Sequence, residues 1–422
     1  MAVTRRQFVA GMSALAASMG FSSAQVARIT QALAEGPSWS FGPGKGNKPK
    51  VLWIGGAECT GCSISTLSLY EDALGESIVA SGISTLDALG LATGPANVPG
   101  TLHGAGLNVD GDGAIVNIAD VLVDILDLQY HQTVMGMGGD LAAQFLNDQI
   151  VNSASGDPFV LVVEGSTQAN DKGGAWDNAG SHPWCEIGAT DAGVGIYSDN
   201  AVEALASSAA CAAVISIGQC ASFGGYPSAV PPAFRGMGDN EGRQTGSMST
   251  FEFLKYKNQN GAADKVINVP GCPPNPWWLV LTIVAWLVDF HHPGTLGILD
   301  ENAKIIPGAL DKSQRLKAVY PYGMHTAFCP RMNDFTNNRF ATKPGEKGCL
   351  QLIGCKGPST KTLCGLRGWN NQQPENRRKE VDQYGAAALA GPRGGNCVMG
   401  GHPCMACTED GYPDRFVPFI PR

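Results

Sequence analysis

Val51-Leu52-Trp53-Ile54, followed directly by Gly55-Gly56-Ala57-Glu58-Cys59-Thr60-Gly61-Cys62, has the pattern of a buried strand that runs into a glycine-rich turn. Similar apolar runs follow at 159–163, 212–217 and 266–269, each close to Gly or Pro. Helical patterns lie between these runs, at 117–127, 140–150 and 199–209. This alternation predicts an α/β domain with a parallel sheet covered by helices on both faces.

Cysteines follow three of the four predicted strands. Cys59 and Cys62 come after the first, Cys220 after the third and Cys272 after the fourth. In an open parallel sheet, sites form at the carboxyl ends of the strands, so we expect these thiols to meet. A lone C-x-x-C is equally consistent with zinc or a redox dithiol. Thiols gathered from so much of the chain favour an iron–sulfur cluster over a structural zinc.

The last third of the chain has a different character. After about residue 295 the periodicity fades, and the segment 320–422 holds seven cysteines among many Gly and Pro residues. Such polypeptide can be ordered by metal clusters, because ligand bonds replace missing apolar burial. We expect a boundary near Pro293-Gly294 that separates a first domain, 50–293, from an irregular second domain, 294–422. The Gly-rich stretch 87–115 is interpreted as a surface insertion.

The first 34 residues have the pattern of an export signal. Arg5 and Arg6 precede an apolar stretch of small residues, no acidic residue occurs before Glu35, and Ala32-Leu33-Ala34 offers a small-x-small cleavage site. This predicts a twin-arginine signal peptide over 1–34 rather than an amphipathic helix. The twin-arginine route carries folded proteins, so metal could be installed before export to the periplasm or the outer face of the cytoplasmic membrane.

The composition excludes other classes of protein. The 422 residues are 44% hydrophobic and 16% charged with a net charge of −8, and no basic stripe is present, which argues against binding to nucleic acid. No segment reaches the roughly 20 apolar residues that span a bilayer. The longest candidate, 277–288, is interpreted as a buried helix, so we expect no membrane span in this chain.

The cysteine motifs resemble those of one known family. C-T-G-C-S, V-E-G-S, G-x-C-A-S-F-G-G, P-G-C-P-P, G-C-K-G-P and H-P-C-x-x-C occur in this order over about 50–422. These motifs occur in the same order in the small subunit of nickel–iron hydrogenases, and the sequence therefore resembles that family. The resemblance implies a flavodoxin-like domain followed by an irregular, cluster-stabilised domain. It also implies an electron-transfer subunit that pairs with an obligate large subunit, where H₂ is activated.

The resemblance implies three groups of iron–sulfur ligands. They are the proximal 4Fe-4S group of Cys59, Cys62, Cys220 and Cys272, the medial group of Cys364, Cys404 and Cys407, and the distal 4Fe-4S group of His325, Cys329, Cys349 and Cys355. Electrons would pass from the proximal to the medial and distal clusters, and then to a cytochrome or other acceptor near His325.

The sequence departs from the family pattern at two places. Many members have Pro where this chain has Cys397, and their medial cluster is 3Fe-4S. A fourth thiolate at Cys397 predicts a medial 4Fe-4S cluster, and therefore three 4Fe-4S clusters, whereas a spare buried thiol would leave it 3Fe-4S. His325-x-x-x-Cys329 is one residue longer than the usual H-x-x-C. Gly61 and Gly225 stand where some oxygen-tolerant relatives carry extra cysteines, which predicts the standard, oxygen-sensitive type.

A few further residues have open interpretations. Glu58 could orient the cluster loop or join a proton route to the partner, or it could be an exposed acid. His131 is expected to be a packed or capping histidine rather than a ligand, and Cys211 a small core residue. Three alternative functions remain: an iron–sulfur subunit of another respiratory oxidoreductase, a self-contained binuclear metal enzyme that uses the two C-x-x-C pairs, and a disulfide-stapled extracellular binding protein.

Overall fold

The structure is a computed structural model of the chain. It describes residues 27, 50–67, 126–153, 158–169, 185–228, 246–291, 293–294, 296–317, 319–320, 323, 329–362, 364, 369 and 396–413. Several expectations lie outside these residues: the signal peptide except for Ala27, the insertion 87–115, and His325.

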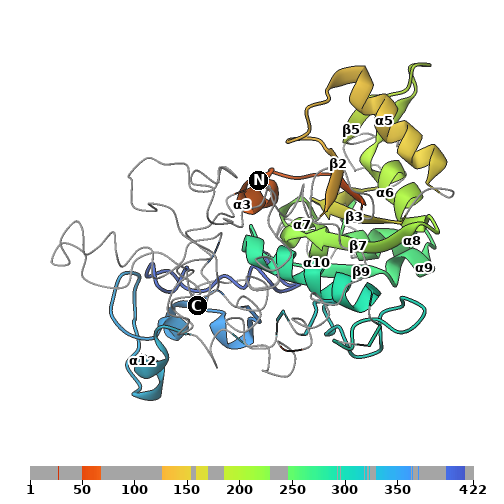
Figure 1. Cartoon of the computed structure of the whole chain (residues 1–422). Helices are drawn as coiled ribbons and strands as arrows, with labels where there is room; N and C mark the ends of the chain where they lie inside the picture. Colours follow the sequence, from red (N-terminus) through yellow and green to blue (C-terminus); the bar gives the residue numbers. More distant parts are fainter. Residues whose placement is uncertain are drawn as a thin grey trace, which may run out of the picture.

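A parallel sheet of five strands forms the centre of the first part of the chain (Figure 1). The strands are β1 (Lys50–Gly55), β2 (Asp127–His131), β3 (Phe159–Glu164), β7 (Cys211–Ile217) and β9 (Val266–Val269). Their spatial order is β2-β1-β3-β7-β9, and all neighbours are parallel. When the five strands are numbered 1 to 5 in chain order, their spatial order is 2-1-3-4-5, which is the order of flavodoxin-like folds. The predicted fold class is therefore confirmed.

Strand β2 differs from the expectation. Its first residue, Asp127, falls at the end of the helix expected over 117–127, so that helix is wrong at its carboxyl end. The strand Asp-Leu-Gln-Tyr-His lies at the sheet edge, and only its last two residues are buried. A half-exposed edge strand tolerates polar residues and therefore lacks the continuous apolar pattern of the central strands.

Alternate strand residues face two different layers. Leu52 and Ile54 point into a core with the helices α5 (Gly139–Asn152), α6 (Ser198–Ser207), α8 (Thr250–Tyr256) and α9 (Asn260–Ala263). Val51 and Trp53 point to the opposite core, which contains α10 (Pro276–His291). Side chains of successive strand residues thus alternate between the two cores, and both faces of the parallel sheet are buried. The helices expected at 140–150, 199–209 and 277–288 are confirmed.

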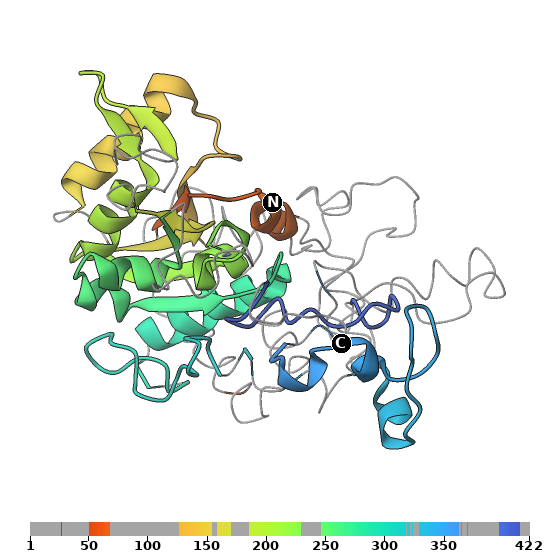
Figure 2. The same ribbon diagram turned by 180° about the vertical axis from the view of Figure 1, so that it is seen from behind.

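Helix α10 joins the two parts of the chain. Its sequence is apolar nearly all round, which is typical of a helix buried on every side. Leu316, Tyr320, Leu350 and Ile353 from the later segment pack in the same core as α10. The described later segment is irregular, with α12 (Met332–Thr336), η6 (Leu350–Ile353) and η7 (Gly357–Ser359) as its short helices (Figure 2). No helix among the described residues has the length and apolar character to cross a membrane.

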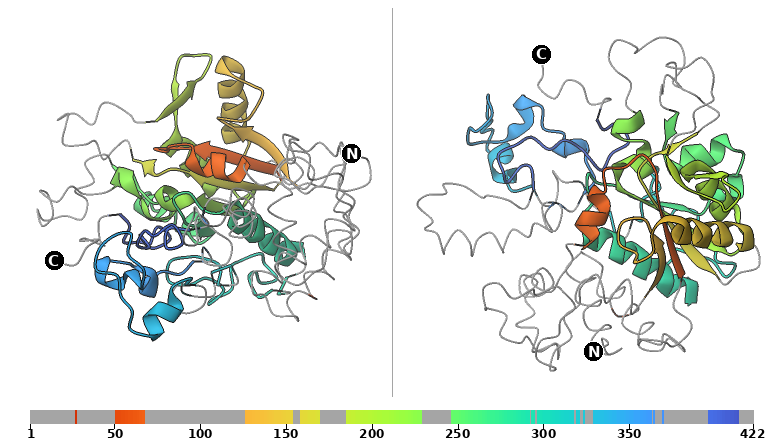
Figure 3. Two further views of the ribbon diagram at one scale, coloured as in Figure 1. Left: turned by 90° about the vertical axis from the view of Figure 1, so that its left-hand side faces the viewer. Right: turned by 90° about the horizontal axis from the view of Figure 1, so that it is seen from above.

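The short elements after β1 and β7 form the carboxyl edge of the sheet. They are α3 (Gly61–Leu67), α7 (Gly218–Phe223) and η4 (Tyr226–Ser228). The domain also contains two small antiparallel pairs of strands. They are β4 (Thr167–Gln168) with β8 (Ser247–Met248), and β5 (Glu186–Ala189) with β6 (Gly195–Tyr197). The strand order reverses between β1 and β3, the position where such sheets bind ligands. Helix α3 begins there, and in Figure 3 it lies between the sheet and the later segment.

Candidate functional site

The four cysteines of the proximal group come together at the carboxyl edge of the sheet. Burial raises the pKa of the Cys62 thiol well above its usual value, and nearby Glu164, Cys220, Cys272 and Cys59 raise it further. Burial also raises the pKa of Cys220 to about 12, with Cys272 and Cys59 among its contributing neighbours. Since the other three thiols all act on Cys62, the segments that follow β1, β7 and β9 bring the four cysteines to one thiol-rich site.

Two glycines allow the backbone to approach these thiols closely. Gly218 has φ +84°, and a Cβ atom there would collide with Cys62 Sγ. Gly225 has φ +55°, and a Cβ atom there would lie 2.6 Å from Cys220 Sγ. Both positions combine a left-handed backbone with no room for a side chain, so only glycine fits without a shift of the thiols.

Glu164, at the end of β3, holds the first turn of α3 in place. Its carboxylate accepts hydrogen bonds from the backbone N–H groups of Cys62 and Ser63, each at 3.0 Å, and from Trp53 Nε1, also at 3.0 Å. The residue is only 2% exposed. A carboxylate here satisfies N–H groups that a helix leaves unpaired at its amino end. The V-E-G-S motif did not by itself reveal this role, although the place of Glu164 at the end of a predicted strand was a usable signal.

Glu58 lies beside this carboxylate. It is half-buried, which argues against a fully exposed acid, and burial together with the Glu164 charge raises its pKa to about 8. His131 is packed as expected: its ring lies 4.7 Å from that of Trp53, and its Nε2 lies 3.0 Å from Ser63 Oγ.

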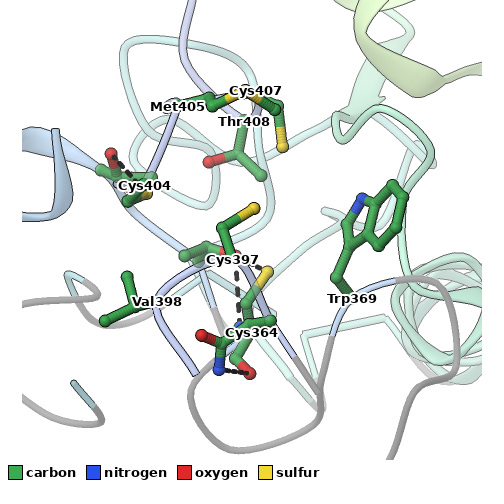
Figure 4. Close-up of a pocket in the computed structure, with 11 residues that line it drawn as sticks. Cys364, Trp369, Cys397, Val398, Cys404, Met405, Cys407 and Thr408 are labelled. Atoms are coloured by element: carbon green, nitrogen blue, oxygen red, sulfur yellow. Dashed lines mark hydrogen bonds between the residues drawn. The ribbon is translucent and has the colours of Figure 1, made fainter. Parts of the chain in front are cut away.

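The medial cysteines line one cavity (Figure 4). Cys364, Cys397, Cys404 and Cys407 surround it together with Trp369. Burial is the main cause that raises the pKa of Cys404 to about 12, and the neighbouring Cys397 thiol contributes to this rise. Burial also raises the pKa of Cys407 well above its usual value, and Cys364, Cys404 and Cys397 add to this effect. The Cys397 thiol thus belongs to the same cavity as the other three.

Three cysteines of the distal group also act on one another. Burial raises the pKa of Cys329, and Cys355 and Cys349 are among the groups that raise it further. Cys349 is fixed in a short irregular turn, where its N–H donates to the carbonyl of Arg339 at 2.7 Å. The fourth expected ligand, His325, lies outside the described residues.

Direct contacts join neighbouring groups. The backbone N–H of Cys404 donates to Cys355 Sγ at 3.3 Å, which links the medial and distal groups. Trp369 Nε1, from the medial cavity, donates to the carbonyl of Cys272 at 3.1 Å. Although burial is the largest influence on the Cys407 thiol, a hydrogen bond from the backbone of Cys272 lowers its pKa. The cysteines of the medial group therefore contact residues of both other groups.

A buried ion cluster supports the medial cavity. Arg315, 1% exposed, pairs with Asp311 and Glu409, each at 2.8 Å, and its Nη1 also donates to the carbonyl of Thr408 at 2.8 Å. Thr408 follows Cys407 directly and lines the cavity. The sequence alone does not reveal this cluster, because Arg315 and Glu409 are 94 residues apart.

The donor set suits iron–sulfur clusters. All thirteen cysteines lie among the described residues and are free thiols, which argues against a disulfide-stapled protein. Buried thiols with raised pKa values ionise only when a cation compensates, as cluster iron does. The described residues contain no group of three or more His, Cys, Asp or Glu side chains that is arranged to hold a single metal ion. Cys211 is buried in the core as expected, and Cys185 Sγ donates to Gln168 Oε1 at 2.9 Å.

Comparisons with known proteins cover both parts of the chain. A family model described as NADH ubiquinone oxidoreductase, 20 Kd subunit, matches residues 113–286. A second, described as the C-terminal part of the NiFe/NiFeSe hydrogenase small subunit, matches residues 320–381. The periplasmic [NiFeSe] hydrogenase small subunit of Desulfomicrobium baculatum is 27% identical, with 99% of each chain covered. The periplasmic [NiFe] hydrogenase small subunit 1 of Nitratidesulfovibrio vulgaris is 26% identical over 99% of this chain and 93% of its own.

The chain is also similar to solved structures of [NiFeSe] hydrogenases. The recombinant [NiFeSe] hydrogenase from Desulfovibrio vulgaris Hildenborough aligns with a TM-score of 0.58 and 25% identity, covering 89% of this chain and 99% of that chain. An H₂-activated [NiFeSe] hydrogenase from Dm. baculatum aligns with the same TM-score and identity, over 89% of this chain and 100% of the other.

Proposed function

We infer from these matches that the chain, which belongs to the nickel–iron hydrogenase small subunits, is the electron-transfer subunit of a hydrogenase. The reaction of the whole enzyme is the reversible oxidation of H₂ to two protons and two electrons. The H₂ chemistry takes place in a large subunit, and this chain conducts the electrons. The first family model alone would also suit an iron–sulfur subunit of a respiratory oxidoreductase, but the second, over 320–381, favours the hydrogenase.

One observation carries this conclusion: three groups of thiols in which the medial group contacts both of the others through hydrogen bonds. Cys272 contacts Trp369 and Cys407 on one side of the medial cavity, and Cys404 contacts Cys355 on the other. A relay needs such closely spaced sites, whereas a structural metal protein does not. Iron–sulfur clusters would supply one-electron storage, while the chain's own residues hold them, exclude water and set their potentials.

The expected ligands are those of the three groups. Cys59, Cys62, Cys220 and Cys272 would hold the proximal 4Fe-4S cluster; Cys364, Cys397, Cys404 and Cys407 a medial 4Fe-4S cluster; and His325, Cys329, Cys349 and Cys355 the distal 4Fe-4S cluster. Support for Cys397 comes from its place in the medial cavity beside Cys364. Glu58, half-buried beside Glu164, is retained as a candidate for a proton route to the partner.

Helix α3 favours the proximal edge as the surface for the large subunit. Its polar residues Ser63, Ser65 and Thr66 are buried, whereas Ile64 and Leu67 are 60% and 42% exposed. This reverses the usual amphipathic pattern and is typical of an interface helix. The exposed Cys59 lies just before this helix. A large subunit docked here would cover the apolar side chains and approach the proximal cluster most closely.

The distal group would deliver electrons to the acceptor, a cytochrome or other carrier near His325. The periplasmic relatives support export of this chain, and Arg5-Arg6 supports the twin-arginine route. On this route the protein would fold and receive its clusters before it crosses the membrane.

The experiment that tests the function uses the anaerobically purified native complex. We expect about twelve iron atoms and matching acid-labile sulfide per small subunit, and reduced-cluster EPR signals that appear on exposure to H₂. H₂-dependent dye reduction should accompany them. Intact complex with little iron would refute the electron relay. Iron without any response to H₂ would instead favour a subunit of another respiratory oxidoreductase.

Cys397→Pro should convert the medial cluster to the 3Fe-4S form. The fourth thiolate is then lost, so we expect one iron fewer per chain and a new EPR signal from an oxidised 3Fe-4S cluster. Its potential should rise, because an anionic ligand has been removed. Cys211→Ala, a core thiol outside the three groups, is the matched control and should leave the iron content unchanged. An unchanged iron count and EPR spectrum in Cys397→Pro would rule out Cys397 as a ligand.

A further inference from the structure

Three threonine side chains line the medial cavity among its cysteines, namely Thr360, Thr362 and Thr408. Each hydroxyl has one proton to donate. Thr360 Oγ1 donates it to the carbonyl of Lys356 at 2.7 Å, and Thr408 Oγ1 donates to the carbonyl of Lys361 at 2.8 Å. Thr362 differs from both, because its hydroxyl lies against a sulfur atom.

The Thr362 hydroxyl is in direct contact with the thiol of Cys364. Its Oγ1 lies 2.9 Å from Cys364 Sγ, and it also accepts a hydrogen bond from the backbone N–H of Cys364 at 3.3 Å. A free thiol could be the donor or the acceptor in the first contact, but a thiolate bound to cluster iron has no proton, so the hydroxyl must donate to it. Thr362 is only 2% exposed, and this bond is therefore shielded from solvent.

The backbone of Cys364 is fixed by a buried amide. Asn396, 7% exposed, donates its Nδ2 to the carbonyl of Cys364 at 2.9 Å, and its Oδ1 accepts a hydrogen bond from the N–H of Met399 at 3.0 Å. Both ends of the amide are thus paired, and a fully paired buried group is rigid. It holds the segment of Cys364 against the segment that carries Cys397.

The segment that follows Cys407 is tied to the sheet. Gln219, which directly precedes Cys220, is 2% exposed and donates its Nε2 to the carbonyls of Glu409 and Tyr412, at 2.8 and 3.3 Å. The lining of the medial cavity therefore has little freedom to move, and the contact between hydroxyl and sulfur is imposed by the fold.

We propose that Thr362 is a positioning residue that donates a hydrogen bond to the Cys364 ligand and raises the reduction potential of the medial cluster. The proposal rests on the proposed function, because it requires a cluster on Cys364, which is an expected ligand of the 4Fe-4S and the 3Fe-4S form alike. Reduction adds negative charge that spreads onto the ligand sulfurs, so a donor at one sulfur stabilises the reduced state more than the oxidised state. This effect opposes that of a fourth thiolate at Cys397. The medial cluster would then accept electrons from the proximal cluster more readily.

The test is an anaerobic redox titration of the purified complex, with the medial cluster followed by EPR. Thr362→Val keeps the branched shape of the side chain but removes the donor, and should shift the midpoint potential of the medial cluster downward. Thr362→Ser retains a hydroxyl and should keep the potential close to that of the unmodified complex. A side chain needed only for packing would not separate the two variants in this way.

Thr360→Val is the matched control. Thr360 Oγ1 also lies near a ligand sulfur, 3.7 Å from Cys404 Sγ, but its own proton is directed to the carbonyl of Lys356. The substitution removes a hydroxyl from the same cavity without removing a donor to sulfur, so it should not lower the medial potential. The Lys356 carbonyl keeps the backbone N–H of Ser359 as a donor at 3.0 Å.

The medial signal is identified with the help of Cys397→Pro. If Cys397 is a ligand, the medial signal is the one that this substitution converts to the oxidised 3Fe-4S form. If Cys397 is not a ligand, the 3Fe-4S signal is present in the unmodified complex. In both cases the medial potential can be followed apart from those of the other two clusters.

Iron content is measured on the same samples, so that the proposed function and this inference can fail separately. Absence of cluster iron from the unmodified complex would refute the function itself. With iron present, an unchanged or raised medial potential in Thr362→Val would overturn the inference, as would an equal fall in Thr360→Val or in Thr362→Ser. If Thr362→Val does not load the medial cluster, Thr362→Ala decides in the same titration. Loss of the cluster from both variants would show that Thr362 serves assembly instead, which also overturns the inference.

Discussion

Replacement of Arg315 by Ala is expected to destabilise the complex strongly and to release medial iron first. The side chain is 1% exposed and pairs with both Asp311 and Glu409 at 2.8 Å. Its removal leaves Glu409 without this counter-charge, and leaves Asp311 with only the half-exposed Lys361, whose Nζ is 3.5 Å away. Breaking a buried ion set by removing one member costs about 3–5 kcal/mol.

The effect should centre on the medial cavity. Glu409 is two residues beyond Cys407, and its carboxylate also accepts a hydrogen bond from the backbone of Lys361, three residues before Cys364. When Arg315 is lost, both ligand-bearing segments lose a shared anchor. We therefore expect a lower thermal midpoint and an iron deficit that approaches one cluster per chain.

Arg339→Ala is the control for this prediction. Arg339 also pairs with an aspartate at 2.8 Å, but its side chain is 58% exposed. An exposed ion pair contributes at most about 1 kcal/mol. The two variants are compared by thermal unfolding of the native complex and by iron analysis. Equal effects of the two substitutions would show that the buried set does not support the cavity.

Introducing aspartates at both Ile64 and Leu67 should separate this chain from its large subunit. These side chains are 60% and 42% exposed on α3. Each apolar side chain buried at an interface contributes about 1.5–3 kcal/mol. The double variant should therefore weaken association by at least about a hundredfold. The new carboxylates add a desolvation cost on top of this loss.

The measurement is co-purification of the large subunit with a tagged small subunit, together with H₂-dependent dye reduction. Both should fall in parallel. Val151→Asp supplies the control, because Val151 is 69% exposed near the end of α5, which returns toward the amino ends of the strands. It should leave association intact. If Val151→Asp weakens pairing as much as the α3 variant, the docking surface does not lie at the proximal edge.

The sequence was sufficient for the strands whose residues are buried on both faces, including β9 at the other edge of the sheet. Phe159–Glu164 is apolar up to its last residue and Val266–Val269 is apolar except for Asn268, and such runs leave little choice of structure. Edge strand β2 was missed because one side of its residues needs no apolar neighbour. The cysteine groups were predictable since ligands must be thiols or histidines, and few other residues can replace them.

The residues that orient the ligands were not predictable in this way. Glu164 accepts a hydrogen bond from the backbone of Cys62, which is 102 residues away in sequence. Trp369 donates a hydrogen bond to the carbonyl of Cys272, which is 97 residues away. Many polar side chains can accept or donate one hydrogen bond, so no sequence pattern distinguishes the one that does. Only the fold shows which carboxylate or indole lies beside which cysteine.

Gln219 ties the loop beside Cys220 to Glu409 and Tyr412, across 190 and 193 residues. A ribosome releases the chain from its amino end, so the sheet with its first cysteines emerges long before these partners exist. The proximal loop consequently cannot make these contacts until Glu409 and Tyr412 have been translated. A prematurely terminated chain would leave a buried amide unpaired at the proximal site, and the cell would have a physical basis for rejecting it.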